Sequence, residues 1–279
     1  GSVQLVFNGE IYNFVELRQQ LEQRGHRFRS SSDSEVIVHL YEDLGPDCVA
    51  ELDGMFALAI WDQHERKLVL ARDRAGKKPL FYSRCADTLV FASEIKALFA
   101  HPAVSPQIES SSIPSYFIHG YVPTPNTFYK GIRQLEPATL MTVDSDGNIA
   151  KQSYWTLQYP TRRDARRSVD TREVRNRVRA LTKEAVRKRL VSDVPLGAFL
   201  SGGIDSSIVV GLMTELTDRP VKTFSIGFEG DPRYDETAYA KLVAKRFGAD
   251  HTEFRVKPNA IDLVEKLIWH HDGPFGDSS

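Results

Sequence analysis

One segment, Leu200-Ser201-Gly202-Gly203-Ile204-Asp205-Ser206-Ser207, restricts the fold of this chain more than any other. It follows a short apolar stretch, Gly197–Leu200, and precedes a helix predicted over Ser206–Leu216. The two glycines permit a tight turn, and the start of a helix offers free N–H groups and the positive end of its dipole. A strand, a glycine-rich turn and a helix in this order predict an α/β domain with a site for phosphate.

The chain continues to alternate strands with helices after this segment. Strands are predicted at Val221–Phe228 and His251–Val256, and helices at Glu236–Phe247 and Ala260–His270. Such alternation indicates βαβ units and a parallel sheet, whose ligands bind at the carboxyl ends of the strands.

The side chains of the glycine-rich segment extend the phosphate hypothesis. Ser201, Ser206 and Ser207 add hydroxyl donors, whereas Asp205 would repel a phosphate unless Mg²⁺ lay between them. The segment is not the familiar P-loop, because it lacks Gly-x4-Gly-Lys-Ser/Thr, and Gly76-Lys77-Lys78 does not supply that pattern either. A glycine-rich turn that only caps a helix is the alternative.

The first half is predicted to be antiparallel β structure with two helices. Short strands and one hairpin are expected at Val3–Phe7, Met55–Trp61, Lys67–Ala71, Leu80–Ser83, Thr88–Ala92, and Thr139–Val143 with Ile149–Tyr154. Apolar periodicity predicts one helix that starts at Phe14 and ends near Gly25, and another around Val36–Tyr41.

Three local expectations accompany this assignment. Asn8-Gly9 is predicted to form a turn, because both residues tolerate a positive φ. The polar run Ser32–Glu35 is expected to cap the second helix, and Pro102–Pro114 is expected to be an irregular connection.

The composition excludes several classes of protein. With 279 residues, 41% of them hydrophobic, the chain has material for a core and length for two domains. A net charge of −1 removes the electrostatic reason to expect a nucleic-acid binder, and no stretch is apolar over the roughly 20 residues that cross a membrane. Cys48 and Cys85 are too few for a disulfide framework, which favours a reducing, cytoplasmic compartment.

A basic run at residues 161–189 separates the two halves. Such a run can form a nucleic-acid patch, but no aromatic residue interleaves it. Val174, Val178 and Leu181 recur at helical spacing, so a solvated linker followed by an amphipathic helix is favoured. We place a boundary near Tyr159–Asp170, between domains at residues 3–160 and 171–279.

Several motifs resemble those of one enzyme family. Ser201-Gly202-Gly203-Ile204-Asp205-Ser206 resembles the PP-loop of ATP pyrophosphatases, which split ATP into AMP and pyrophosphate. Four segments of the first half are similar, in the right order, to the glutaminase half of glutamine-hydrolysing asparagine synthetases: Asn8–Asn13, Asp53–Ala57, Arg72–Leu80 and Phe91–Lys96. The resemblance implies an N-terminal-nucleophile-type αββα glutaminase domain followed by a parallel-sheet PP-loop α/β domain.

The resemblance also implies residues that bind glutamine. Asn8 and Gly9 correspond to the oxyanion hole, one through its side-chain amide and one through its backbone N–H. Glu10 and Asp33 correspond to residues that hold glutamine, with Asp33 pairing the α-ammonium group.

A second set of residues corresponds to the family's ATP and pyrophosphate site. The loop residues are Leu200, Ser201, Gly202, Gly203, Asp205, Ser206 and Ser207, with Mg²⁺ at Asp205. Ile226 corresponds to a residue that packs near adenine, and Asp277 lies in a segment that borders the family's site.

The chain departs from the family at both ends. The family's nucleophile is a cysteine that opens the mature chain, and neither Cys48 nor Cys85 can use a free α-amine as its base. Gly1-Ser2 is typical of tag removal, and the family's second glycine-rich ATP motif does not appear. We therefore expect a fragment that lacks both ends and is inactive by itself.

These observations predict a parent protein that is an ATP-dependent ligase with glutamine as amide donor. It would form asparagine from aspartate through a β-aspartyl-AMP intermediate, without nucleic-acid or membrane partners, and a homodimer is compatible with the family. Two alternatives stay open. One is a related enzyme that amidates another carboxylate, as in antibiotic or surface-polysaccharide synthesis, and the other is a non-catalytic binding or regulatory module that keeps the fold.

Overall fold

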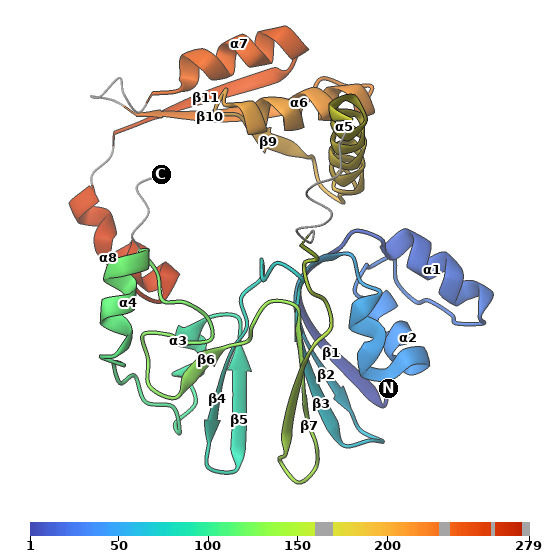
Figure 1. Cartoon of the computed structure of the whole chain (residues 1–279), viewed down its shortest axis with the longest axis vertical. Coiled ribbons are helices and arrows are strands. Elements are labelled where there is room, and N and C mark those ends of the chain that lie inside the picture. The colour runs from blue at the N-terminus through green and yellow to red at the C-terminus, as the bar shows by residue number, and fades with distance from the viewer. Residues whose placement is uncertain (160–169, 229–234, 258–259, 275–279) are drawn as a thin grey trace. The chain divides into compact units, whose positions relative to one another are not determined.

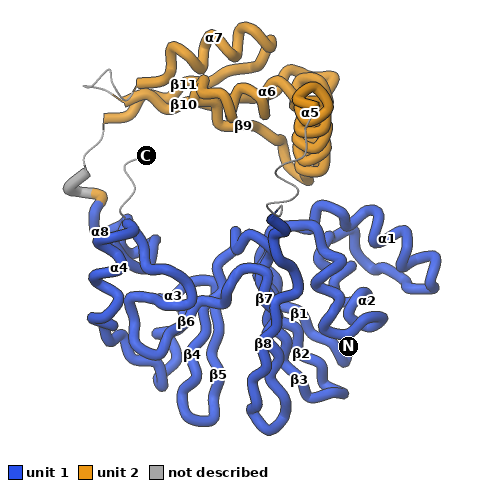
Figure 2. Tube along the Cα trace, in the orientation of Figure 1, with its two compact units in different colours: residues 1–159, 264–279 blue, residues 160–263 orange. Residues whose placement is uncertain are grey.

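The computed structural model describes residues 1–159, 170–228, 235–257 and 260–274, which divide into two compact units (Figures 1 and 2). Unit 1 comprises residues 1–159 and 264–279, and unit 2 comprises residues 160–263. The boundary predicted near Tyr159–Asp170 falls mostly outside the described residues, and Asp277 lies outside them too. The architecture is mixed α/β, as predicted.

Unit 1 contains two antiparallel sheets, with strand orders β1-β2-β3-β7-β8 and β5-β4-β6. The strands of the larger sheet are β1 (Val3–Ile11), β2 (Gly54–Asp62), β3 (Lys67–Arg72), β7 (Thr139–Val143) and β8 (Ile149–Ser153). The strands of the smaller sheet are β4 (Phe81–Cys85), β5 (Thr88–Ala92) and β6 (Ile132–Gln134). The antiparallel pairing and the β7–β8 hairpin confirm the prediction, whereas β6 was not foreseen.

Apolar clusters stack these two sheets between helices (Figure 1). The helices of unit 1 are α1 (Phe14–Gln23), α2 (Glu35–Leu44), η1 (Gly45–Ala50), α3 (Ile95–Leu98), α4 (Ser112–His119) and most of α8 (Ala260–His271). One face of the larger sheet packs on α1 and α2 around Leu21 and Phe56. Its other face meets the smaller sheet at Leu80 and Met141, and Leu98 of α3 packs on the outer face of the smaller sheet. The layers therefore follow the αββα order.

Two buried charged residues hold the loop that crosses from one sheet to the other. Asp73 is 1% exposed and accepts hydrogen bonds at 3.0–3.1 Å from four backbone N–H groups, one in β2 and three in the loop. Arg72 donates to three backbone carbonyls at 2.5–2.7 Å. Because a buried charge is tolerated only when it is hydrogen-bonded, these contacts fix the path from β3 to β4.

Unit 2 is built on a parallel sheet of order β11-β10-β9. Its strands are β9 (Gly197–Phe199), β10 (Lys222–Phe228) and β11 (Asp250–Val256), and its helices are α5 (Thr171–Lys188), α6 (Ile204–Leu216) and α7 (Thr237–Phe247). Helices α6 and α7 pack together around Leu200, and α5 packs against α6 through Val186. Ile204–Leu216 begins two residues before the predicted helix start.

The turn predicted at Asn8-Gly9 is wrong, because β1 runs through both residues as far as Ile11. A Cβ on Gly9 would lie 2.1 Å from the carbonyl oxygen of Met55 in β2. The glycine therefore serves a close approach of two strands, and not a turn.

Three further local predictions need correction. Ser34 is the N-cap of α2 and makes no side-chain capping bond, so the predicted cap at Ser32–Glu35 does not form. The connection predicted at Pro102–Pro114 contains a β-bridge at Ile108 and the first residues of α4. The predicted amphipathic helix forms as α5, but its apolar stripe is largely exposed, with Val178 at 57% and Leu181 at 54%, and Val186 is its buried residue.

No helix in the part of the chain that the structure describes has both the length and the apolar character that a membrane span needs.

We expect the substitution D73N to lower the free energy of unfolding by about 2–4 kcal/mol, because an amide NH₂ would face N–H donors that now share a carboxylate. The matched control D146N, at an exposed turn residue, should change stability by less than about 0.5 kcal/mol. Urea unfolding of both variants measures the difference. A D73N protein as stable as the parent would show that the crossing loop does not depend on this carboxylate.

Candidate functional site

The residues expected to bind glutamine gather at the open edge of β1. Phe56, opposite Gly9, directs both its N–H and its carbonyl to Asp73, on the side away from β1. Gly9 and Phe56 are thus a non-hydrogen-bonded pair, and the Gly9 N–H points away from β2. The Ile11 N–H points the same way, and Asp33 Oδ2 accepts it at 2.8 Å. Gly9 and Asp33 therefore lie at the same strand edge.

Asn8 lies on the face of β1 that looks toward the smaller sheet. Its Nδ2 donates to Ser93 Oγ at 3.1 Å, and both residues line a cavity of about 280 Å³ with walls from β1, β2 and β5. Glu10 follows Asn8 on the same strand face and is exposed. Ser93 was missed as a site residue, although it belongs to the quoted segment Phe91–Lys96. Asn8 and Gly9 thus carry a side-chain amide and an outward N–H on consecutive residues of β1.

Glu35 holds the loop that carries Asp33. Its carboxylate accepts hydrogen bonds from Arg29 N at 2.7 Å, Ser30 N at 2.8 Å and Ser30 Oγ at 2.5 Å. Burial favours the neutral acid, but these bonds outweigh it and lower the pKa of Glu35 from 4.5 to about 2. The loop before α2 is thus fixed by an ionised side chain.

Four of the residues expected to bind ATP meet at the carboxyl edge of the unit 2 sheet. Leu200, Ser201, Ser206 and Ile226 line one cavity of about 330 Å³, where β9 ends and α6 begins. The Leu200 N–H donates to the carbonyl of Phe224 at 2.8 Å, which continues the parallel pairing of β9 and β10. Ser201 Oγ and Ser206 Oγ lie 3.0 Å apart. Two hydroxyls thus stand beside the N-terminus of α6, where a phosphate would be favoured.

The two glycines of this loop have different roles. Gly202 has a φ of +83°, and a Cβ there would meet the backbone of Tyr239 at 2.5 Å, so it serves the turn and the packing of α7. Gly203, the N-cap of α6, has an ordinary φ of −69°. A Cβ on Gly203 would contact only Ser201 Oγ, at 3.3 Å, which leaves open space at the helix N-terminus.

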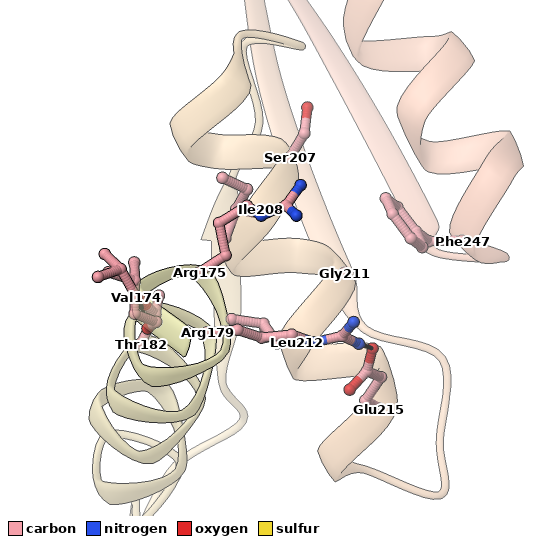
Figure 3. Close-up of a pocket in the computed structure, with 11 residues that line it drawn as sticks. Val174, Arg175, Arg179, Thr182, Ser207, Ile208, Gly211, Leu212, Glu215 and Phe247 are labelled. Atoms are coloured by element: carbon pink, nitrogen blue, oxygen red, sulfur yellow. Dashed lines mark hydrogen bonds and ion pairs between the residues drawn. The ribbon is translucent and has the colours of Figure 1, made fainter. Parts of the chain in front are cut away.

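Ser207 and Asp205 lie outside this cavity. Ser207 Oγ donates to the Gly203 carbonyl at 2.7 Å, and Ser207 lines a separate, mostly apolar groove of about 540 Å³ among α5, α6 and Phe247 (Figure 3). Asp205 is exposed in the first turn of α6. Within the described residues, its carboxylate has no hydrogen-bond or ion-pair partner, so its oxygens are available to a cation.

Phe199, Ser225 and Glu236 also line the 330 Å³ cavity, and sequence reasoning missed them. Phe199 ends β9 and Glu236 is the N-cap of α7, whereas Ser225 lies in the middle of β10. For Phe199 and Glu236, that position was the available signal, because ligands of parallel sheets bind there. Ser225 is positioned by a hydrogen bond to β11, since its Oγ lies 3.2 Å from His251 Nε2.

Comparison with protein families assigns both halves of the chain. Residues 1–155 match the model described as glutamine amidotransferase domain, and residues 177–279 match the model described as asparagine synthase. The chain belongs to the glutamine amidotransferase family. The two modules follow one another in the order expected for glutamine-hydrolysing asparagine synthetases, so the resemblance found in the sequence is confirmed.

Curated relatives of this chain agree with its assignment to the family. A Methanocaldococcus jannaschii protein, whose name includes asparagine synthetase [glutamine-hydrolyzing] 2, is 39% identical over 280 residues, which is 99% of this chain and 52% of that protein. Asparagine synthetase [glutamine-hydrolyzing] 3 of Bacillus subtilis is 36% identical, covering 97% of this chain and 45% of the relative. Amidase chyE of Penicillium rubens is 31% identical over 294 residues, which is 99% of this chain and 42% of that protein. The chain spans about half the length of the curated relatives it matches.

We expect E35Q to lower the free energy of unfolding at pH 7 by about 1–2 kcal/mol, because it removes an ionised acceptor of three hydrogen bonds. The pKa of Glu35 is lowered on folding, so its contribution is present above about pH 4.5 and is lost as the pH falls through about 2. The difference from the parent protein should therefore shrink between those pH values. Chemical unfolding of E35Q and of the exposed control E51Q at pH 7 and pH 3 measures it, and a difference that does not depend on pH would contradict this account.

Proposed function

We propose that this chain works as part of an ATP-dependent amidotransferase that converts aspartate to asparagine with nitrogen from glutamine. The observation that carries the proposal is the presence of a glutamine amidotransferase module and an asparagine synthase module in succession on one chain. Residues 3–160 would form the glutamine amidotransferase domain and residues 171–279 part of the ATP domain. The curated relatives named as asparagine synthetases support this acceptor.

The glutamine site would lie along the open edge of β1. The ammonium group of glutamine would pair with Asp33, and the side-chain carbonyl would face Asn8 and the N–H of Gly9. The shared strand edge supports this placement, because Ile11 directs its N–H to Asp33 from the same side as Gly9. Glu10, exposed next to Gly9, would take part in holding the substrate.

The ATP site would lie at the carboxyl edge of the unit 2 sheet. Ser201, Ser206 and the first amides of α6 would hold phosphate oxygens, the open space at Gly203 would admit them, and Ile226 would pack near adenine. A carboxylate oxygen of aspartate would attack the α-phosphorus of ATP and release pyrophosphate. Ammonia would then attack the acyl carbon and displace AMP, which leaves the amide.

Asp205 would hold Mg²⁺ beside the phosphates. Its exposed carboxylate supplies the hard oxygen ligands that Mg²⁺ prefers, at a helix start that also favours phosphate. When bound, the ion would neutralise charge on the leaving pyrophosphate.

We also propose that residues 1–279 do not hydrolyse glutamine by themselves, because neither cysteine lies at the Asn8 cavity. Cys48 is fully buried, and burial raises the pKa of its thiol to about 12. Cys85 packs on the opposite side of the smaller sheet, among the residues that contact α3. Neither thiol is placed to attack a substrate beside Asn8.

The alternative is that the enzyme amidates a carboxylate other than aspartate, and one observation favours it. Amidase chyE, a relative of nearly the same coverage, does not have asparagine synthetase in its name. A related amidotransferase acting on another carboxylate would keep every residue of the two sites described above. The test measures pyrophosphate release by the full-length protein with ammonia as nitrogen source. The carboxylate that supports this release distinguishes the aspartate hypothesis from the alternative.

In the full-length protein, we expect N8A to lower the rate of glutamine-dependent amide synthesis by about 10²–10³-fold, because one oxyanion donor is lost. The rate with ammonia should not change, since the ATP site lies in the other unit. N148A, an exposed turn residue of the same unit, is the matched control. Equal losses with glutamine and with ammonia would show that Asn8 supports the fold and is not specific to glutamine cleavage.

A further inference from the structure

Two imidazoles and a carboxylate converge beside α2 in unit 1, and none of them is assigned to glutamine or ATP. His26 follows α1, whereas His39 and Glu42 lie three residues apart on α2. One ligand atom from each lies within 4.8 Å of the other two. Neither the family resemblance nor the proposed reaction uses these side chains.

The separations among the three atoms match a tetrahedral metal site. His26 Nδ1 and His39 Nδ1 lie 3.1 Å apart, and Glu42 Oε2 lies 3.0 Å from His39 Nδ1 and 3.5 Å from His26 Nδ1. Zinc binds histidine nitrogen at about 2.0–2.1 Å and carboxylate oxygen at about 2.0–2.2 Å, so tetrahedral ligands stand roughly 3.3–3.5 Å from each other. A single ion can therefore contact all three atoms with small movements of the side chains.

The contact between His26 and Asp43 directs a nitrogen lone pair of His26 into this cluster. His26 Nε2 lies 2.9 Å from Asp43 Oδ1, so the proton of a neutral His26 belongs on Nε2 and its Nδ1 carries a lone pair. That lone pair faces His39 Nδ1, and a proton on His39 Nδ1 would be shared between His26 Nδ1 and Glu42 Oε2. A metal ion at this point would take the place of that proton. The hydrogen bond of His26 to Asp43 is also the carboxylate–histidine contact that orients metal-binding imidazoles.

We propose that His26, His39 and Glu42 bind one Zn²⁺ ion, with Asp43 holding His26 in place. Two imidazoles favour zinc over Mg²⁺ or Ca²⁺, which prefer oxygen ligands. The His26 and His39 side chains are 16% and 15% exposed, whereas Glu42 is 46% exposed. The ion would thus be sheltered on its nitrogen side and open on its carboxylate side, where water completes the fourth position.

The site would link His26, in the segment after α1, to His39 and Glu42 of α2. The loop between them includes Asp33, so the ion would fasten this loop at the point where His26 meets α2. Zinc binding is proposed independently of the reaction, and only its benefit to glutamine binding rests on the proposed function.

Titration of metal-free protein with ZnCl₂ in a calorimeter tests the proposal. We expect one Zn²⁺ per chain, and a thermal transition that rises with zinc. The variants H26A and H39A should abolish this binding, and D43N should weaken it by about 10- to 100-fold because the support of His26 is lost. H64A, at an exposed histidine of the same unit, should bind as the parent protein does.

If a histidine variant fails to fold, E42Q still tests the proposal. Glu42 is exposed, so this substitution leaves the core intact. Co²⁺ should give the visible absorption of a tetrahedral site in the parent protein, and this absorption should be lost or shifted in E42Q. Zinc binding of equal strength and stoichiometry in the parent, H26A and E42Q proteins, or no binding to the parent, would overturn the proposal.

Discussion

The buried carboxylate of Asp73 determines where the rest of unit 1 lies. It holds the loop that crosses from the larger to the smaller sheet, and so it brings Ser93 of the smaller sheet to Asn8 of β1. It also engages Phe56 from the β3 side. That contact sets the alternation of hydrogen bonds between β2 and β1, and it leaves the Gly9 N–H at the open strand edge. The buried charge of Asp73 therefore supports both the cavity beside Asn8 and the outward N–H of Gly9 in the proposed glutamine site.

Unit 2 relies on a different constraint, the common direction of its strands. Parallel pairing places the ends of β9 and β10 at one edge, where the N-terminus of α6 also begins. Serine hydroxyls and apolar side chains meet there, and α6 directs its positive dipole end toward them. Asp205 lies outside the residues that line the cavity, in the first turn of α6, and is a candidate cation ligand.

Much of this arrangement could be predicted from the sequence, because apolar periodicity and glycine-rich turns are local signals. Most strands of both halves and the helix at the glycine-rich turn came from such signals, whereas β6 did not. The family came from the resemblance of several motifs in the right order. Asn8-Gly9 was read wrongly because a local turn preference cannot reveal nine residues of pairing with β2. Glu236 and Ser93 were missed because their importance depends on segments that meet only in the fold. The exposure of Val178 on α5 was likewise a matter of tertiary packing.

The central claim is that the two modules together amidate a carboxylate through an acyl-adenylate. The most direct measurement uses aspartate labelled with ¹⁸O in its side-chain carboxylate, with ATP, glutamine and the full-length protein. The account predicts that one labelled oxygen appears in AMP for each asparagine formed, because the carboxylate oxygen that attacks the α-phosphorus leaves with AMP. Asparagine formed with unlabelled AMP, or with ADP and labelled phosphate, would contradict it.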